Sequence, residues 1–482
     1  MLRDTAIFSF SRYVLLGMSF VRNFVVARIL DPEEYGYWVI VMLVLTYGDQ
    51  IHFGLRHAGD KEIPFLQGQG REDDSRKAAN TIFGGILLIS VIALAMLGVF
   101  AWIRGSERGA VENMILIAGV IVFGDQVCRY YLMIMRVKRM FVFSSRFEII
   151  AEAVRMVLVC VLVYYFSLWG AITGFLAGAV FMALYAIFHF KREFVPRLDR
   201  RLLVRLLSLG VSLFGVSMLF VLLINADRLF AATILSKEQL GIYGVAALAA
   251  QLPLSFSQAV SMVVYPHMSE TFGKSNTVEA LYPLFAVVLR SLSFVIPLIA
   301  ATTFFGATLL IGMFLPAYHE SPGILVVLVP GVFFLSFIPF LSGLFTAANR
   351  ARQFVLVELI AAMCAALLFY AVQGFLAGPK GVAVAMTTGM LVYAAAAIVA
   401  AYRLFAVKPV ESLRHIAWTY FPSLYSMLVL GIIVNTVGDP MDPAAAMTGY
   451  GLFLLASVPL MVFAYHALDV RKIIGILRAP NG

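Results

Sequence analysis

The sequence predicts an all-α polytopic membrane protein of about fourteen transmembrane helices. Two parallel-repeat six-helix lobes surround a central cavity, and two further helices follow at the C-terminal end. Three observations lead to this fold class: a very apolar composition, long apolar runs along the whole chain, and an internal repeat. The 482 residues are 62% hydrophobic and 13% charged, with a mean hydropathy of +0.92. Because a soluble protein would expose much of this apolar surface to water, we infer that the chain lies in a lipid bilayer.

The predicted helices are the apolar runs that can cross about 30 Å of hydrocarbon. The connections between them are short, and no soluble domain is inserted. The runs are 5–28, 36–56, 78–103, 113–135, 147–166, 168–189, 206–232, 239–266, 283–306, 324–348, 354–375, 381–402, 415–436 and 446–468.

The basic residues orient these helices. A net charge of +9 would suggest nucleic acid in a soluble protein, but cytoplasmic loops of membrane proteins collect Lys and Arg, so we expect no nucleic-acid partner. With a cytoplasmic N-terminus, 25 of the 36 basic residues fall on the inner side and five on the outer side. This bias predicts an even number of helices and two cytoplasmic termini.

A repeated motif divides the chain. Residues 27–40, ARILDPEEYGYWVI, return at 232–245 as ATILSKEQLGIYGV. Six predicted helices separate the copies, an even number, so the two lobes have the same orientation in the membrane. We expect the matching Gly36 and Gly241 to form a tight turn, which makes the motif itself structural.

The domain boundaries follow from the repeat and from two basic breaks. The N-terminal six-helix lobe covers 1–190, and the stretch 191–205 is a basic cytoplasmic linker. The C-terminal six-helix lobe covers 206–403, and 404–482 carries the two additional helices.

All six basic residues inside the predicted helices are arginines. A charge in the membrane is costly, so such residues usually face a cavity or a partner. The guanidinium stays ionised, and its planar fork of donors suits phosphate and carboxylate. An Arg-lined aqueous cavity would favour an anionic substrate, with pyrophosphate a natural candidate. The six are Arg12, Arg22, Arg129, Arg155, Arg228 and Arg290.

Two of these arginines have acidic residues at helical spacing. Asp125 precedes Arg129 by four residues, and Glu152 precedes Arg155 by three, with Glu148 one turn earlier. Residues three or four apart share a helix face and can neutralise each other. We favour structural pairing for both sets, and we keep their four residues as further candidates for cavity charges.

Arg22 and Arg228 are the stronger candidates for substrate binding, because neither has an acid three or four residues away. The register of the repeat places Arg22 opposite Asp227, and a bridge between them is a structural alternative that would leave Arg228 free. Asn23 could add polar lining. Arg56, at the inner end of the second helix, could meet a headgroup or serve as an ordinary positive-inside residue.

Enzymatic motifs are missing from the sequence. There is no phosphate-binding Gly-rich loop with GK[ST], the largest predicted outer loop is only 307–323, and the seven His show no metal spacing. We therefore expect no catalysis, cofactor or bound metal, and leave a coupling cation open.

Several of these residues belong to motifs of a known family. Residues 224–270 contain Asp227-Arg228, then LSKEQLGIY, then an apolar helix ending in Pro-His-Met-Ser. Together with ARILDPEEYGYW and GLRHA at 54–58, this resembles the polysaccharide and O-antigen flippases of the multidrug/oligosaccharidyl-lipid/polysaccharide exporter superfamily. The motifs span about 80 residues, whereas the helix count and lobe layout agree over the whole chain.

The resemblance implies two six-helix lobes forming a V around a central cavity. Related lipid II flippases carry cavity-facing arginines in helix one and in the C-terminal lobe. Arg22 and Arg228 are the nearest matches, and Arg56 is a third. The drug-exporting branch often uses an acid in helix one, whereas this helix has Arg22-Asn23 and no acid beyond Asp4.

The favoured function is therefore a flippase for a polyprenyl-pyrophosphate-linked oligosaccharide, an O-antigen or exopolysaccharide unit, in the bacterial inner membrane. Membrane lipids and a polysaccharide polymerase are the other expected partners. The alternative is a cation-coupled exporter of small or drug-like molecules, in which Asp227, Glu152 or Glu358 would matter more than the arginines. A membrane-embedded glycosyl-transfer enzyme is disfavoured, because the sequence offers no large extramembrane loop.

Overall fold

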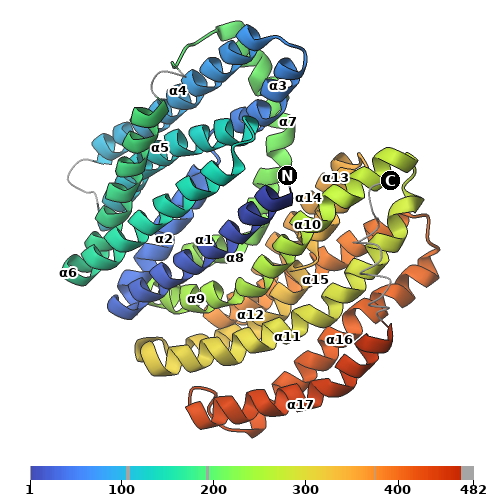
Figure 1. Cartoon of the computed structure of the whole chain (residues 1–482). Helices are drawn as coiled ribbons and strands as arrows, with labels where there is room; N and C mark the ends of the chain where they lie inside the picture. Colours follow the sequence, from blue (N-terminus) through green and yellow to red (C-terminus); the bar gives the residue numbers. More distant parts are fainter. Residues whose placement is uncertain (1, 105–108, 191–194, 374, 468–482) are drawn as a thin grey trace. The chain divides into compact units, whose positions relative to one another are not determined.

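The computed structural model describes residues 2–104, 109–190, 195–373 and 375–467, and within these ranges the chain is helical with no strand (Figure 1). The all-α class predicted from the sequence is confirmed. The first four linker residues, 191–194, lie outside the described residues, as do some of the basic residues counted above: Arg108 on the outer side and those between 471 and 478 on the inner side.

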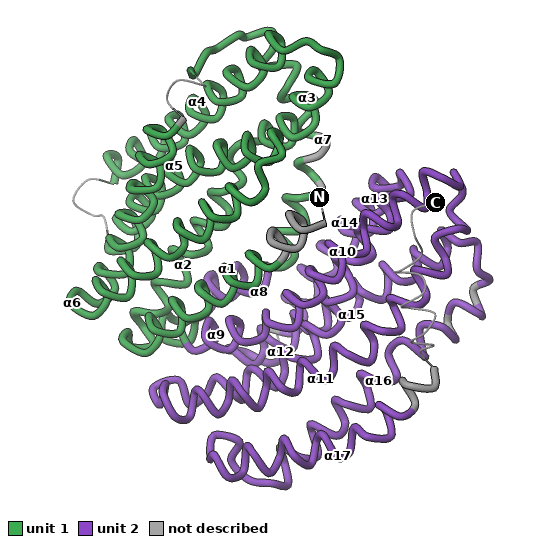
Figure 2. The backbone as a smooth tube through the Cα atoms, viewed as in Figure 1, with its two compact units in different colours: residues 1–225, 236–241 green, residues 226–235, 242–482 purple. Residues whose placement is uncertain are grey.

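The chain forms two compact units, coloured separately in Figure 2. The first contains residues 1–225 and 236–241. Within it, α1 and α5 pack on α6, and α3 packs on α4 and α7. Its helices are α1 (Leu2–Ile29), α2 (Pro32–Gly48), α3 (Leu55–Gly68), α4 (Glu72–Arg104), α5 (Ala110–Val137), α6 (Phe141–Phe190) and α7 (Arg200–Ile224).

The second unit contains residues 226–235 and 242–482. Within it, α15 packs on α12 and α14, and α11 packs on α16 and α17. Its helices are α8 (Ala226–Ile234), α9 (Lys237–Ala250, whose first five residues belong to the first unit), α10 (Leu252–Ser275), α11 (Tyr282–Phe314), α12 (Ser321–Leu335), α13 (Ile338–Ala347), α14 (Ala351–Gln373), α15 (Pro379–Leu404), α16 (Pro409–Thr436) and α17 (Pro443–Ala467).

The helices make this a multi-pass membrane protein. Among the described residues, ten are long and apolar enough to cross a bilayer, and the bent pair 217–224 and 226–234 raises this to eleven. Each of the fourteen predicted runs overlaps a helix, although the number of membrane crossings stays a prediction.

The long helix α6 contains the break that the sequence placed between 147–166 and 168–189. Phe166 and Ser167 have non-helical backbone angles, and Ser167 lies in the left-handed region at φ 49°. The two predicted helices are therefore separate segments on either side of this kink.

The second predicted helix, 36–56, has the wrong boundaries. α2 covers Pro32–Gly48, and its N-cap Asp31 accepts a hydrogen bond from the backbone N–H of Glu34. Gly54 then adopts φ +88°, a left-handed conformation that glycine takes without strain, and α3 starts one residue later. α3 is an additional helix that hydropathy alone assigned to a loop, because its apolar residues form only one stripe.

Two predicted helices are broken in the middle. The run 206–232 divides at Asn225 into α7 and α8, which meet at 52°. The run 239–266 divides at Gln251, and Pro253 in the first turn of α10 is typical of a helix start because proline lacks an N–H. Interrupted membrane helices expose backbone groups that can line a binding site.

The glycines of the repeat do not form a tight turn. Gly36 and Gly241 lie inside α2 and α9, where they allow two backbones to touch. A Cβ on Gly36 would lie 1.9 Å from the carbonyl oxygen of Lys237, and one on Gly241 would lie 1.8 Å from that of Pro32. The prediction that the motif is structural is right, but the reason is close helix packing.

Candidate functional site

Arg22 of α1 has a carboxylate partner that its local sequence does not reveal. Its Nη1 donates to Oε1 of Glu152 on α6, and its Nη2 donates to the hydroxyl of Ser19 at 3.1 Å. The Arg22 side chain is only 6% exposed. The expectation that Arg22 stands without an acid is therefore wrong, because the acid comes from a helix 130 residues away.

Arg155 extends this pair into a chain of four charges. Its Nη2 contacts Oδ1 of Asp125 on α5, and its Nη1 lies 3.9 Å from Oε2 of Glu152. The ring of Phe175 lies beside both arginines, with its centroid 5.0 Å from Cζ of Arg22 and 4.3 Å from Cζ of Arg155. Cation–π attraction favours this arrangement. This group of four charged side chains has two positive and two negative charges, so the group is neutral as a whole.

The predicted pairing within helices is only partly found. Asp125 contacts Arg155 instead of Arg129, while the Glu152–Arg155 contact exists but is long. Glu148 binds Arg12 of α1 at 3.1 Å. Contacts between helices therefore replace contacts along one helix, because a neighbouring helix can present an opposite charge closer to the side chain.

A second cluster surrounds Asp49, a residue that the sequence analysis did not single out. Arg56 donates from Nη1 to Oδ1 of Asp49 at 3.1 Å and from Nη2 to the backbone oxygen of Asp49 at 2.6 Å. Nε of Arg129 lies 3.5 Å from the same Oδ1. Two arginines share one carboxylate here, which leaves one positive charge, and the Arg129 side chain is 48% exposed.

Asn23 is engaged within the first unit. Its amide oxygen accepts from Nε1 of Trp38 at 3.1 Å, and its Nδ2 donates to the backbone oxygen of Ser19 at 2.8 Å. The Trp38 contact joins α1 to α2, whereas the Ser19 contact lies within α1. This geometry gives Asn23 a role in holding the two helices together.

In the second unit, Asp227 and Arg228 point to different partners. Oδ2 of the buried Asp227 accepts from the hydroxyl of Tyr243 at 3.3 Å, whereas Oδ1 has no hydrogen-bond partner. Nη2 of Arg228 donates to the backbone oxygen of Ala247 at 3.2 Å. With the amide of Gln251 turned to present its oxygen, that oxygen accepts from both Nη atoms of Arg228, at 2.5 and 3.1 Å.

Arg228 has no carboxylate within 4 Å among the residues that the structure describes. Its hydrogen bonds go to neutral oxygens, the neighbouring Asp227 acts on its charge without forming a salt bridge, and the side chain is partly exposed. The two helix breaks explain its position: α7 ends at Asn225, directly before the short α8 that carries Arg228, and Gln251 stands at the break between α9 and α10. Sequence reasoning found Arg228, but it missed Gln251 and Tyr243, which lie at unremarkable positions in apolar helices.

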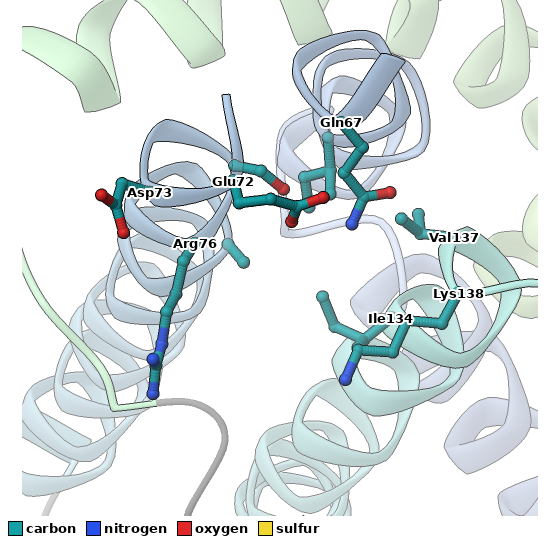
Figure 3. Close-up of a pocket in the computed structure, with 10 residues that line it drawn as sticks. Gln67, Glu72, Asp73, Arg76, Ile134, Val137 and Lys138 are labelled. Atoms are coloured by element: carbon teal, nitrogen blue, oxygen red, sulfur yellow. The ribbon is translucent and has the colours of Figure 1, made fainter. Parts of the chain in front are cut away.

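A cavity of about 400 Å³ lies elsewhere, at the ends of α3 and α5 and the start of α4 (Figure 3). Gln67, Glu72, Arg76 and Lys138 line it together with apolar residues that include Ile134. None of the residues predicted for the site lines this cavity. No group of three or more potential metal ligands occurs in the described part of the chain.

Known structures share this fold. The structure described as the lipid II flippase MurJ in an inward closed conformation has a TM-score of 0.66 and 16% identity, and covers 95% of this chain and 99% of its own. An inward-facing multidrug resistance MATE family transporter of the MOP superfamily gives 0.61 and 15%, covering 83% and 98%. A MOP superfamily transporter from Pyrococcus furiosus gives 0.55 and 14%, covering 86% and 96%. At these identities the likeness establishes the fold alone.

Sequence comparison identifies the family. No curated protein matches the chain. The family described as polysaccharide biosynthesis protein matches residues 25–321, more than half of the sequence. This range contains both copies of the repeat and seven of the nine residues predicted for the site, whereas Arg22 and Asn23 lie just before it. The chain belongs to the polysaccharide biosynthesis protein family and has the fold of the MOP superfamily transporters.

Proposed function

We propose that this protein is an alternating-access flippase for a polyprenyl-pyrophosphate-linked oligosaccharide, such as an O-antigen or exopolysaccharide repeat unit. It would move the headgroup from the inner to the outer leaflet of the bacterial inner membrane, while the polyprenyl tail remains in lipid. The family match and the fold support a role of this class.

The guanidinium of Arg228, which forms no salt bridge among the described residues, is the observation that carries the substrate assignment. An uncompensated arginine in a membrane helix is costly unless a ligand or water cavity receives it. Its neutral partners, Ala247 and Gln251, orient the guanidinium without neutralising it. A pyrophosphate oxygen pair matches the planar donor fork of such a group.

The first unit offers a second positive site of the same kind. The Asp49 cluster has an excess charge of +1, and its half-exposed Arg129 is the member whose contact with Asp49 is longest. By contrast, Glu152 and Asp125 neutralise Arg22 and Arg155. We therefore rank Arg228 and Arg129 above Arg22 as phosphate ligands, with Arg56 positioned by Asp49.

Translocation by reconstituted protein tests the proposal. A fluorescent polyprenyl-pyrophosphate oligosaccharide is incorporated into proteoliposomes, and its arrival in the outer leaflet is followed with an impermeant quencher. We expect Arg228→Gln to abolish flipping and Arg228→Lys to retain part of it, because Lys keeps the charge but loses the fork. Arg352→Gln, which removes an exposed arginine at the start of α14, is the matched control.

Two outcomes would contradict the assignment. Flipping by Arg228→Gln at the rate of the unmodified protein would remove Arg228 from the site. Resistance of a drug-sensitive host to toxic compounds, with no translocation of the lipid-linked oligosaccharide, would instead support the cation-coupled exporter.

A further inference from the structure

A buried carboxyl group lies in the second unit, on a different helix from Arg228. Glu358 is in the second turn of α14, and its exposed fraction is 0%. The helix packs along α15, which provides most of its neighbours. Acidic residues at such depth in a membrane helix are rare and are usually functional.

Glu358 has one polar partner. The hydroxyl of Tyr393 on α15 donates to its Oε1 at 3.1 Å, and its Oε2 is buried without a hydrogen-bond partner. Among the described residues, no Lys, Arg or His lies within 4 Å of the carboxyl group, so no salt bridge compensates a negative charge there. A carboxylate held in this way would be an isolated buried ion.

The described ionisable residues of the surrounding helices provide no cation that pairs with Glu358. α13, which packs on α14, has no ionisable residue. α8 contacts α14 through the stacked rings of Phe230 and Phe369, 4.3 Å apart. The other ionisable groups on these helices, none paired with Glu358, are Arg352, Cys364 and Tyr370 of α14, Lys380, Tyr402 and Arg403 of α15, and Asp227 and Arg228 of α8.

The cost of charge decides the protonation state. Burying an ionised carboxylate without a cation costs several kcal/mol or more, so such a group takes up a proton instead. A neutral acid with one unsatisfied oxygen costs only about 1–3 kcal/mol. A metal cation is a poor substitute for the proton, because no third His, Cys, Asp or Glu stands near enough to complete a ligand set in the described residues.

We propose that Glu358 and Tyr393 form a proton-binding site, loaded in the structure described here. The bound form is the neutral acid, with Tyr393 donating to Oε1 and the proton on Oε2. Release gives the carboxylate and one proton to water, which requires water to reach the buried pair. Loading is thereby linked to a change in packing between α14 and α15.

This site also supplies a coupling ion for transport, a part of the proposal that rests on the proposed flippase function. Both loading and release need water at the pair, so the closed pair keeps its proton and exchanges it only in the states in which water enters from one side of the membrane or the other. One proton would then cross the membrane per completed cycle. The glycan-bearing headgroup and the proton use different helices, so their sites can be separated by mutation.

Infrared spectroscopy of the purified, full-length protein tests the binding site without any transport. A protonated carboxylic acid has a carbonyl stretching band that carboxylates lack. We expect this band at neutral pH, its loss in Glu358→Gln, and its persistence in Glu411→Gln, which removes an exposed acid of α16. In Tyr393→Phe the band should shift to higher frequency, because the carbonyl oxygen loses its hydrogen bond. A band unchanged in both Glu358→Gln and Tyr393→Phe would overturn the site.

Proteoliposomes with an imposed pH gradient test the coupling. We expect Glu358→Gln to keep oligosaccharide exchange at equal pH on both sides but to lose acceleration by the gradient. Full acceleration in Glu358→Gln would overturn the coupling role. Absence of oligosaccharide movement in the unmodified protein would refute the proposed function, while the infrared result would still decide whether Glu358 binds a proton. If Glu358→Gln does not fold, Tyr393→Phe gives the same decision through its band shift and its altered gradient response.

Discussion

Gly36 and Gly241 occupy equivalent positions of the repeat, and each packs against the residue that begins the other's helix. Gly36 touches Lys237, the first residue of α9, and Gly241 touches Pro32, the first residue of α2. Lys237 and Pro32 are themselves equivalent in the repeat. The contact is thus nearly symmetric, as expected where two related segments meet about a pseudo-twofold axis.

Alanine at either glycine should destabilise the protein. A Cβ at Gly36 or Gly241 would collide with a backbone carbonyl, which cannot rotate away as a side chain can. Overpacking of this kind costs about 1–3 kcal/mol or more. We expect a lower midpoint of thermal unfolding in detergent for Gly36→Ala and for Gly241→Ala. The double variant should be destabilised by less than the sum of the two single variants, because moving α2 and α9 apart once relieves both collisions.

Gly17→Ala is the control for this prediction. Gly17 is also helical, but nothing lies within 4 Å of its Cβ position. Its replacement should be neutral or stabilising, since alanine favours a helix interior over glycine by about 0.5–1 kcal/mol. Equal midpoints for Gly17→Ala and Gly36→Ala would show that the close contact is unimportant.

The Arg22–Glu152 pair should be sensitive to removal of one partner. Glu152→Gln leaves a buried guanidinium that Arg155 repels, and breaking a buried pair costs about 3–5 kcal/mol. The double variant Arg22→Met with Glu152→Leu should be more stable than Glu152→Gln alone, because no isolated charge remains. Unfolding in detergent measures both.

An exposed pair provides the comparison. Glu270 and Lys274 of α10 form a salt bridge of 2.9 Å with both side chains largely exposed. Glu270→Gln should leave the unfolding midpoint almost unchanged, because water screens an exposed ion pair. If Glu152→Gln were as mild as Glu270→Gln, the four-charge chain would have no structural role.

The sequence predicted the helices well because hydropathy acts over whole segments. Even the kink at Phe166–Ser167 appeared as a gap between two apolar runs. The breaks at Asn225 and Gln251 were missed, because the apolar pattern continues across both positions. α3 was missed for the opposite reason, since only one face of that helix is apolar.

The charged partners were harder to predict than the charged residues. The sequence alone identifies the six arginines inside the predicted helices, because a charge within an apolar run is conspicuous. Helical spacing suggested Asp125 for Arg129, but the partner of Arg129 is Asp49, which is remote in sequence. Spacing along one helix carries no information on which neighbour lies at the same depth, so Arg22–Glu152 required the tertiary structure.

Gly54 and Gly210 make a second close approach, between the start of α3 and the middle of α7. A Cβ on Gly54 would lie 2.3 Å from the carbonyl of Gly210, and Gly54 also has φ +88°. Gly54→Ala should therefore suffer both backbone strain, about 1–2 kcal/mol, and overpacking of similar size. We expect a marked fall in its thermal unfolding midpoint.

Gly70→Ala separates the two causes. Gly70 has a similar conformation, φ +73°, but no atom lies within 4 Å of its Cβ position. The Gly70→Ala variant should therefore lose only the stability that backbone strain costs. The difference between Gly54→Ala and Gly70→Ala then measures the α3–α7 contact, and no difference would mean that α7 moves away at little cost.

His57 of α3 should make stability depend on pH. Its Nε2 lies 3.0 Å from the hydroxyl of Ser217 on α7, and the centroid of its ring lies 5.4 Å from that of the His52 ring. Burial, together with the nearby Arg56 guanidinium, lowers the pKa of His57 below its ordinary value. Because the unfolded chain then binds the proton more readily than the folded one, the stability that neutral His57 contributes is fully present above about pH 6.5 and is lost as the pH falls below it.

Between pH 8 and pH 5, the thermal unfolding midpoint should fall more in the unmodified protein than in His57→Gln. His319→Gln, which replaces an exposed histidine just before α12, should retain the full pH response. The same slope in His57→Gln as in the unmodified protein would assign the pH response to another group of the same sign, such as the neighbouring His52, whose pKa burial also lowers.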